Sequence, residues 1–390
     1  MSNDASDIKP PAHKPTVYRH FHRIAWLAVA LALCVIVFGA FVRLSNAGLS
    51  CPDWPTCYGR ATWPTVIAEV NHPTALDVRP LEVSKAWREQ VHRHAAAVLG
   101  ALVLLLALFA ARRRRFGIAQ ILLAAGLISV GIPLYMRGMH DAAIACAVLG
   151  EIILLIAALR WNNDDLSRVA TFTLMLIVFQ ALLGMWTVTM LLKPVIVMGH
   201  LLGGMATFSM LTWMAWRATG SPVRIAGVNA MRGWLVGAVV VVGIQIALGG
   251  WVSANYAALA CGNDFPTCVG RWVPPHDFRE GFVLWRGVGV DYEGGVLDGA
   301  SRIAIQLAHR MMAVVVFVYL LWMALKLIRT PGLWLTGIVL GVLMLAQVGL
   351  GIANVVLGLP LWTAVLHNGG AALLLFLLVG LLARLCRPTV

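Results

Sequence analysis

Ten long apolar segments, separated by short polar or basic stretches, dominate the chain. A helix needs about 20 mainly apolar residues to cross the hydrocarbon core of a membrane. Such segments are helical because every backbone amide must find a partner within its own segment. The pattern therefore predicts ten transmembrane helices. Their expected spans are 24–43, 95–111, 117–136, 142–160, 169–190, 195–216, 233–253, 304–325, 333–356 and 361–383.

Composition leads to the same class of protein. Hydrophobic residues make up 60% of the 390 residues and charged residues only 12%, whereas a soluble domain is about half apolar and a quarter charged. The formal net charge is +13, but the basic residues flank the apolar segments and form no separate basic domain. We therefore expect an all-α integral membrane protein that contacts lipid and has no nucleic-acid partner.

The basic residues also predict the orientation of the helices, because short cytoplasmic loops are rich in Lys and Arg. The short loops on the other side hold only Arg137 and Lys193. Both termini are therefore expected in the cytoplasm. The opening residues lack the apolar core of a signal peptide, and a bacterial inner membrane fits best. The basic residues assigned to the cytoplasmic side are Lys9, Lys14, Arg19, Arg23, Arg112 to Arg115, Arg217, Arg224, Arg232, Lys326, Arg329, Arg384 and Arg387.

The chain contains an internal repeat. The end of the first apolar segment, Gly39 to Cys51, resembles the end of the seventh, Gly249 to Cys261. Each is followed by an aromatic-Pro-Thr-Cys turn, a long outer loop and a His-Arg pair. The matching motifs are 54–57 with 265–268, and His92-Arg93 with His309-Arg310.

The second half of each repeat matches as well. Gln180 precedes His200, and Gln347 precedes His367, by the same 20 residues (200 − 180 and 367 − 347). This indicates a duplicated four-helix unit. The first copy is longer because it holds two extra apolar runs, which we interpret as an inserted transmembrane hairpin. The expected organisation is a cytoplasmic tail over 1–23, a first repeat over 24–217 with the hairpin at about 116–160, a linker over 218–232 and a second repeat over 233–390.

Four histidines recur in the two repeats near the outer ends of their helices: His92, His200, His309 and His367. Ionisable side chains within a membrane are costly and mark functional sites. A single histidine could be satisfied by a carbonyl or hydroxyl group, but recurrence favours ligation, and paired imidazoles on facing helices bind heme iron in bundles. We predict two heme sites, one per repeat. His94 points to a different helix face from His92 and has no counterpart.

The repeats differ at one chemically important position. Glu89 lies three residues before His92, whereas Gln306 lies three residues before His309. This spacing places each residue on the same helix face as its histidine. A carboxyl group beside a reactive centre can transfer a proton or stabilise positive charge. The alternative is that Glu89 is a solvated residue at a helix start. The asymmetry favours one reactive heme and one that passes electrons.

Cysteine and arginine pairs also recur. Cys51 and Cys57, like Cys261 and Cys268, are spaced closely enough for a disulfide within each outer loop. A zinc site is disfavoured because no CxxC spacing occurs and no histidine recurs beside either pair. Arg93 and Arg310 follow the histidines. They could bind heme propionates or extend to lipid phosphates. Glu151 lies within the inserted hairpin, where pairing with a neighbouring helix is favoured over a cavity.

Together these residues resemble the heme A synthase family. The resemblance covers the chain apart from the hairpin and the N-terminal tail. It implies two pseudo-symmetric four-helix bundles and an enzyme that oxidises the C8 methyl group of heme O to the formyl group of heme A. The extra helix pair departs from the family's eight helices. The motifs are Gly-x-x-x-Arg-Leu-Ser-x-x-Gly-Leu-Ser at 39–50, Glu89-x-x-His92-Arg93 and Gln180…Gly184…His200, with their counterparts.

The resemblance implies a role for each histidine pair. His92 and His200 would hold the substrate heme, with Glu89 beside the oxidised methyl group, and His309 and His367 would ligate heme b. Two hydroxylations would give a diol that loses water. The cysteine pairs resemble the loop disulfides of some members. Heme O is the implied substrate, and heme O synthase, oxidase assembly factors and a second copy of the chain are candidate partners.

Two other functions fit parts of the pattern. A di-heme electron-transfer cytochrome that oxidises quinol would hold two identical b-type hemes and would not need Glu89. A transporter with parallel repeats would hold no stoichiometric heme. The heme content of the purified protein separates the three.

Overall fold

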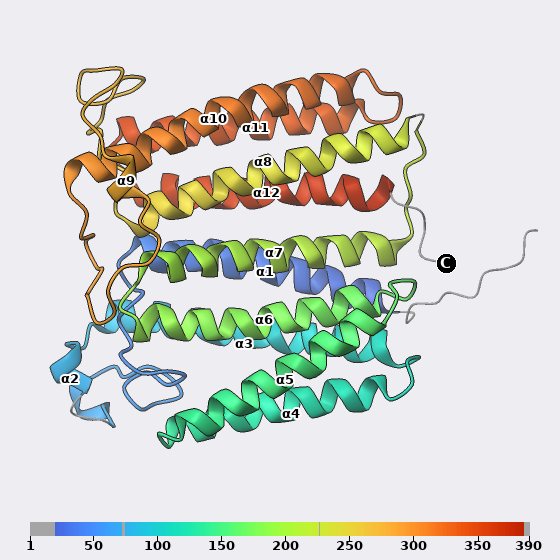
Figure 1. Ribbon diagram of the computed structural model, residues 1–390, viewed down its shortest axis with the longest axis vertical. Helices are drawn as coiled ribbons and strands as arrows, with labels where there is room; N and C mark the ends of the chain where they lie inside the picture. The colour runs from blue at the N-terminus through green and yellow to red at the C-terminus, as the bar shows by residue number, and fades with distance from the viewer. Residues whose placement is uncertain (1–19, 72–74, 226, 386–390) are drawn as a thin grey trace, which may run out of the picture.

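Ten long helices make up most of the described part of the chain (Figure 1). The computed structural model describes residues 20–71, 75–225 and 227–385, and ten helices in these ranges are long and apolar enough to cross a membrane. They match the ten predicted spans one for one. They are α1 (Phe21–Leu44), α3 (Val83–Ala111), α4 (Gly117–Met136), α5 (His140–Arg160), α6 (Ser167–Thr189), α7 (Pro194–Thr219), α8 (Val228–Ala254), α10 (Gly299–Ile328), α11 (Trp334–Val356) and α12 (Leu361–Leu385).

Three short elements lie in the two long loops: η1 (Ile67–Glu69), α2 (Ala75–Val78) and α9 (Phe278–Gly281). Most of the predicted cytoplasmic tail, residues 1–19, lies outside the described residues. The same holds for Arg387, one of the basic residues that predicted the orientation.

Helices α3 and α10 begin earlier than the apolar pattern predicted. Helix α3 starts at Val83 rather than at residue 95, and α10 at Gly299 rather than at 304. Their first turns carry polar side chains, which end an apolar run but not a helix. The start of α10 is capped by Asp298, whose carboxylate accepts a hydrogen bond of 2.8 Å from the backbone of Ser301. The extension places His92 well inside α3.

The long helices pack as two rings of four. In the first ring α1, α3, α6 and α7 each contact two neighbours, and in the second α8, α10, α11 and α12 do the same. The repeat pairs α1 with α8, α3 with α10, α6 with α11 and α7 with α12. Between the rings, α7 contacts α12, and the contact of α1 with α12 matches that of α7 with α8. The rings are thus related by a pseudo-twofold arrangement, as the duplication predicted.

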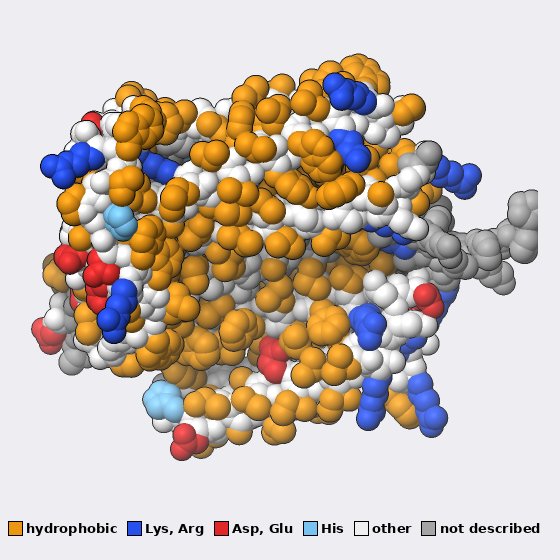
Figure 2. All heavy atoms as spheres, turned by 45° about the horizontal axis from the view of Figure 1, so that its top comes forward, with side chains coloured by type: hydrophobic (Ala, Val, Ile, Leu, Met, Phe, Trp, Pro, Cys, Tyr) orange, Lys and Arg blue, Asp and Glu red, His pale blue; other side chains and the backbone are white. Residues whose placement is uncertain are grey.

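The two ends of the molecule differ in character. The long loops, 45–82 and 255–298, lie together at one end, which we call the loop end (Figure 1). Helix α1 begins and α12 ends at the opposite end, which we call the basic end because it holds Arg112 to Arg115. Figure 2 shows a broad hydrophobic surface between the two ends. An even number of crossings places the start of the first helix and the end of the last on the same side.

One arginine of the basic end has a structural partner. Arg114 Nη2 lies 2.8 Å from Asp165 Oδ1 and ties the α3–α4 turn to the α5–α6 turn. Burial alone would raise the pKa of Asp165, but hydrogen bonds from Arg114 and Ser167 lower it below its usual range.

Polar contacts join the two repeats at the loop end. The guanidinium group of Arg43, at the end of α1, donates to the hydroxyl of Tyr256 at 3.1 Å. Arg79 in the first long loop forms ion pairs of 2.7 Å with Glu293 and 3.1 Å with Asp291 in the second. The two outer loops therefore cover the helix ends as one connected layer.

The inserted hairpin, α4 and α5, packs against the outside of the first ring through α3 and α6 (Figure 1). Its helices approach closely where they carry glycine: a Cβ atom added at Gly150 would lie 2.7 Å from the side chain of Ile128. Glu151 is half-buried, and its Oε1 atom has no hydrogen-bond partner among the described residues. The sequence favoured pairing of Glu151 with a neighbouring helix. The structure shows no hydrogen bond between this oxygen and the described residues.

Candidate functional site

Four histidines lie at corresponding positions near the loop end. His92 and His309 lie roughly three turns into α3 and α10, and His200 and His367 about two turns into α7 and α12. Within each ring the two helices concerned are diagonally opposite. His92 lies close enough to His200, and His309 to His367, for a charge on one imidazole to act on the other. The structure thus brings together, across the centre of each ring, the two histidines that the repeat pairs.

Each imidazole ring lies against a glycine of a neighbouring helix. A Cβ atom added at the glycine would lie 2.8 to 3.4 Å from the Cε1 atom of the ring. A larger residue would push the ring aside, because a packed aromatic ring cannot bend out of the way. The pairs are Gly39 with His92, Gly184 with His200, Gly249 with His309 and Gly351 with His367. Both repeats therefore shape the same space around their histidines.

Glutamines of neighbouring helices lie against three of the four histidines. The Nδ1 atom of His367 lies 3.1 Å from the backbone carbonyl of Gln347, which suits a tautomer whose Nε2 atom is free to bind a metal. The backbone of Gln180 faces His200 in the same way, although the Nδ1 atom of His200 lacks hydrogen-bonding geometry. Nδ1 of His309 lies 3.2 Å from the side-chain amide of Gln245.

Buried polar atoms near the histidines lack protein partners. Among the described residues these include Nδ1 of His92 and of His200, both amide atoms of Gln180 and Oε1 of Gln306. Native structures leave few such atoms unpaired unless a ligand or water reaches them. The described residues hold no group of three or more His, Cys, Asp or Glu suited to a metal ion. Two imidazoles per ring instead suit a heme iron, because the macrocycle supplies the remaining ligands.

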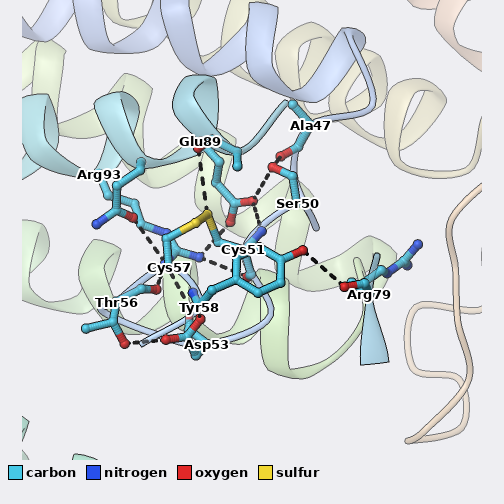
Figure 3. The surroundings of a disulfide bond; sticks show 12 residues. Ala47, Ser50, Cys51, Asp53, Thr56, Cys57, Tyr58, Arg79, Glu89 and Arg93 are labelled. Carbon is cyan, nitrogen blue, oxygen red and sulfur yellow. Dashed lines mark hydrogen bonds and ion pairs between the residues drawn. A yellow bond between two sulfur atoms is a disulfide. The ribbon is translucent and has the colours of Figure 1, made fainter. Parts of the chain in front are cut away.

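Glu89 is fixed by the first disulfide loop (Figure 3). Its Oε2 atom accepts hydrogen bonds of 2.9 Å from the hydroxyl of Ser50 and from the backbone N–H of Cys51. Its Oε1 atom accepts one of 2.6 Å from Arg93. The side chain is buried, with 5% of its surface exposed. This environment contradicts the alternative that Glu89 is a solvated residue at a helix start.

The structure gives Arg93 and Arg310 partners that the sequence did not suggest. Arg93 Nη1 donates to the carbonyls of Asp53 and Thr56 at 2.8 and 2.7 Å. Arg310 Nη1 and Nη2 donate to the carbonyls of Thr267 and Asp264, both at 2.9 Å. Each guanidinium group therefore holds the disulfide loop of its own repeat. From the sequence, the roles considered for Arg93 and Arg310 were binding of heme propionates and contact with lipid phosphates.

Both cysteine pairs form disulfides in the outer loops. Cys51 is bonded to Cys57 and Cys261 to Cys268, and all four side chains are buried. Among the described residues, only the first disulfide loop donates hydrogen bonds to a carboxylate on a transmembrane helix, because the second repeat has Gln306 at the position of Glu89. Gln306 is also buried, yet its Oε1 atom has no partner among the described residues.

Tyr58 anchors the first disulfide loop to the rest of the outer layer. Burial, together with the nearby carboxylates of Glu89 and Asp53, raises the pKa of Tyr58 to about 12. The hydroxyl therefore stays protonated at neutral pH and donates to the carbonyls of Arg79 and Pro80 at 3.1 and 3.2 Å. Because Arg79 also pairs with the second loop, the position of Glu89 is linked to both repeats.

Sequence reasoning missed several residues of the site. Ser50 and the four glycines contact Glu89 and the histidines, and their signal was present: Gly39 aligns with Gly249, and Gly184 with Gly351, in the repeat. Gln245 gave no signal because the first repeat has no matching glutamine. His94 is exposed, in agreement with the choice of His92.

We expect Gly39→Ala to lower the free energy of unfolding by about 1–3 kcal/mol, the usual cost of overpacking. The added Cβ atom would lie 2.8 Å from the ring of His92. Gly100→Ala on α3 is the matched control, because nothing lies within 4 Å of its added Cβ atom and alanine favours a helix. Thermal unfolding in detergent measures both. Equal responses of the two variants would contradict tight packing at His92.

The sequence model of the COX15-CtaA family, described as a cytochrome oxidase assembly protein, matches residues 22–133 and 141–379. The break in the match falls near the turn between α4 and α5. The match therefore includes most of the hairpin, and the resemblance is wider than the motifs of the repeats predicted.

Heme A synthases resemble the chain along most of its length. That of Shewanella oneidensis is 37% identical over 366 residues, which cover 92% of this chain and 95% of that protein. That of Caulobacter sp. strain K31 is 32% identical over 219 residues, 54% of this chain and 60% of that protein. The heme A synthase of Halalkalibacterium halodurans is 25% identical over 236 residues, which cover 58% of this chain and 72% of that protein. The chain therefore belongs to the heme A synthase (COX15-CtaA) family.

Proposed function

We propose that this protein is a heme A synthase, an oxidoreductase that converts the C8 methyl group of heme O to the formyl group of heme A. One observation carries the proposal: both rings hold a histidine pair in a glycine-lined setting, but only the first has a carboxylate, Glu89, one turn from a histidine. An electron-transfer protein has no need for this difference. An enzyme that oxidises one heme and keeps the other needs two different sites.

The two rings have different roles in this proposal. His92 and His200, in the repeat over 24–217, bind heme O as substrate. His309 and His367, in the repeat over 233–390, bind heme b, which supplies electron transfer. Ligation by these histidines is supported by the contact of His367 Nδ1 with the Gln347 carbonyl, which leaves Nε2 for the iron, and by the unpaired Nδ1 atoms of His92 and His200. The acid in the first ring supports the choice of that ring for heme O.

Oxidation of a methyl group to an aldehyde removes four electrons. The proposed oxidant is dioxygen: in each of two successive hydroxylations one oxygen atom turns a C–H bond into a C–OH bond, and the other leaves as water with two protons and two electrons. The resulting geminal diol loses water to form the formyl group. Glu89 accepts hydrogen bonds from three donors, which fix the position of its carboxylate before the reaction. From there it stabilises positive charge that develops at the reacting carbon or takes a proton from the diol.

The proposed location is the inner membrane of a bacterium, with the loop end in the periplasm. The arginines of the basic end favour a cytoplasmic position for that end. The two disulfides of the loop end suit an oxidising compartment. Heme O synthase and oxidase assembly factors are the proposed protein partners.

The test is to extract the pigments from the purified full-length protein and to identify them by chromatography. We expect heme b together with heme O or heme A. Two equivalents of heme b alone would indicate a di-heme electron-transfer cytochrome. A colourless protein would exclude both functions and favour a transporter.

A further inference from the structure

Two cations lie on the loop-end side of the first histidine pair. Arg88 on α3 precedes His92 by four residues, and Lys193, at the start of α7, precedes His200 by seven. The spacing of four residues places Arg88 on the same face of α3 as His92. Lys193 is the N-cap residue of α7, about two turns before His200. With a rise of 1.5 Å per residue, the two cations lie about 6 Å and about 10 Å closer to the loop end than their histidines.

Neither cation has an anionic partner among the described residues. Lys193 is 1% exposed, and its Nζ atom makes no hydrogen bond. Its contact is with the ring of Trp285, whose centre lies 3.4 Å away. A buried charge that lacks a counter-charge is costly, so this amine points to an anionic ligand.

Arg88 is half-buried and, like Lys193, lies against aromatic rings. Its Nε atom has no partner, and its guanidinium carbon lies 5.1 Å from the ring centre of Phe41 and 5.8 Å from that of Trp87. Aromatic faces orient a guanidinium group but do not neutralise it.

The second repeat lacks both cations. The alignment that pairs His92 with His309 places Ile305 at the position of Arg88. The alignment that pairs His200 with His367 places Pro360 at the position of Lys193. The arginines that do recur, Arg93 and Arg310, are both occupied by loop carbonyls. The unpaired cations are thus confined to the ring that also holds Glu89.

We propose that Arg88 and Lys193 bind the two propionate carboxylates of the heme held by His92 and His200. This inference rests on the proposed function and extends it to substrate recognition. The C8 methyl group and one propionate share a pyrrole ring, so propionates anchored at the loop end bring this methyl group toward Glu89. The two cations would therefore help to select which methyl group is oxidised. Ionic hydrogen bonds to carboxylates are strong enough for such an anchor.

The experiment measures heme affinity by the Soret band in the full-length protein that retains its heme b. Two probes are titrated into the first site: iron protoporphyrin IX and its dimethyl ester, which lacks the carboxylate charges. We expect the wild type to bind the free acid about 10–100-fold more tightly than the ester. The double variant Arg88→Leu/Lys193→Met should lose this preference. The variant Arg88→Lys/Lys193→Arg, which keeps both charges, should retain most of it.

Arg302→Met is the matched control, because Arg302 is a loop-end cation of the second repeat whose side chain donates to the carbonyl of Asp298. It should leave both affinities unchanged. Retained heme b content shows that the double variant is folded. Equal binding of acid and ester by the wild type, or a preference that survives in the double variant, would overturn the inference and leave the proposed function intact. A wild type that binds no second heme would overturn both.

Discussion

Glu89→Gln is expected to lower heme A formation by about 10²–10³-fold, the usual loss when one preorganised electrostatic group is removed from an active site. Both hemes should remain bound, because Glu89 contacts the disulfide loop and is not an iron ligand in the proposal. The second repeat shows that glutamine fits at this position, since Gln306 is buried at the matching place in α10. The loss would therefore reflect the charge rather than the volume of the side chain.

The measurement is the ratio of heme A to heme O in cells that supply heme O, together with the heme content of the purified variant. Glu82→Gln is the matched control, because Glu82 lies just before the same helix but is exposed and pairs only with Lys85. Normal heme A formation in Glu89→Gln would remove Glu89 from the mechanism. Loss of heme from the variant would instead assign it a structural role.

Removing one histidine of a pair is also expected to have a large effect, on the heme content of the protein and on heme A formation. His200→Ala should lose heme O and heme A but keep heme b, because its pair lies in the first ring. His367→Ala should lose heme b and keep heme O, and heme A formation should stop because electrons no longer reach the first ring. The two histidines of a pair would hold the same iron, so a single substitution should remove most of the binding.

Chromatography of the extracted pigments separates these outcomes. His94→Ala is the matched control, since His94 is exposed on α3 and lies on a different face from His92. It should retain both hemes. If His200→Ala and His367→Ala lost the same heme, the assignment of one heme to each ring would be wrong.

Much of the fold was predictable because it depends on local sequence. Apolar runs of sufficient length must be helices in a membrane, so all ten spans were found. The predicted spans began too late for α3, by 12 residues (95 − 83), and for α8 and α10, by five residues each (233 − 228 and 304 − 299). In α3, polar residues such as Glu89 lower the hydropathy without ending the helix. The repeat was visible from the equal spacing of Gln180 to His200 and of Gln347 to His367.

The partners of polar side chains were less predictable. Arg93 lies next to His92 in the sequence, which suggested a role at the heme, yet its guanidinium group reaches residues some 40 positions away in the disulfide loop. The sequence also left open whether Glu89 is solvated. Its burial depends on the loop that folds over the end of α3 and supplies Ser50 and Cys51.

The sequence by itself determined the ten helices, their duplication and the histidine, cysteine and acidic residues that distinguish the two halves, because these features depend on composition and on spacing along one chain segment. The tertiary structure decided which groups meet: the glycine against each imidazole, the loop donors around Glu89 and the cations left without a partner. These contacts join residues on different helices or loops. They are set by how the two rings and the outer loops pack, which no short segment of the sequence specifies.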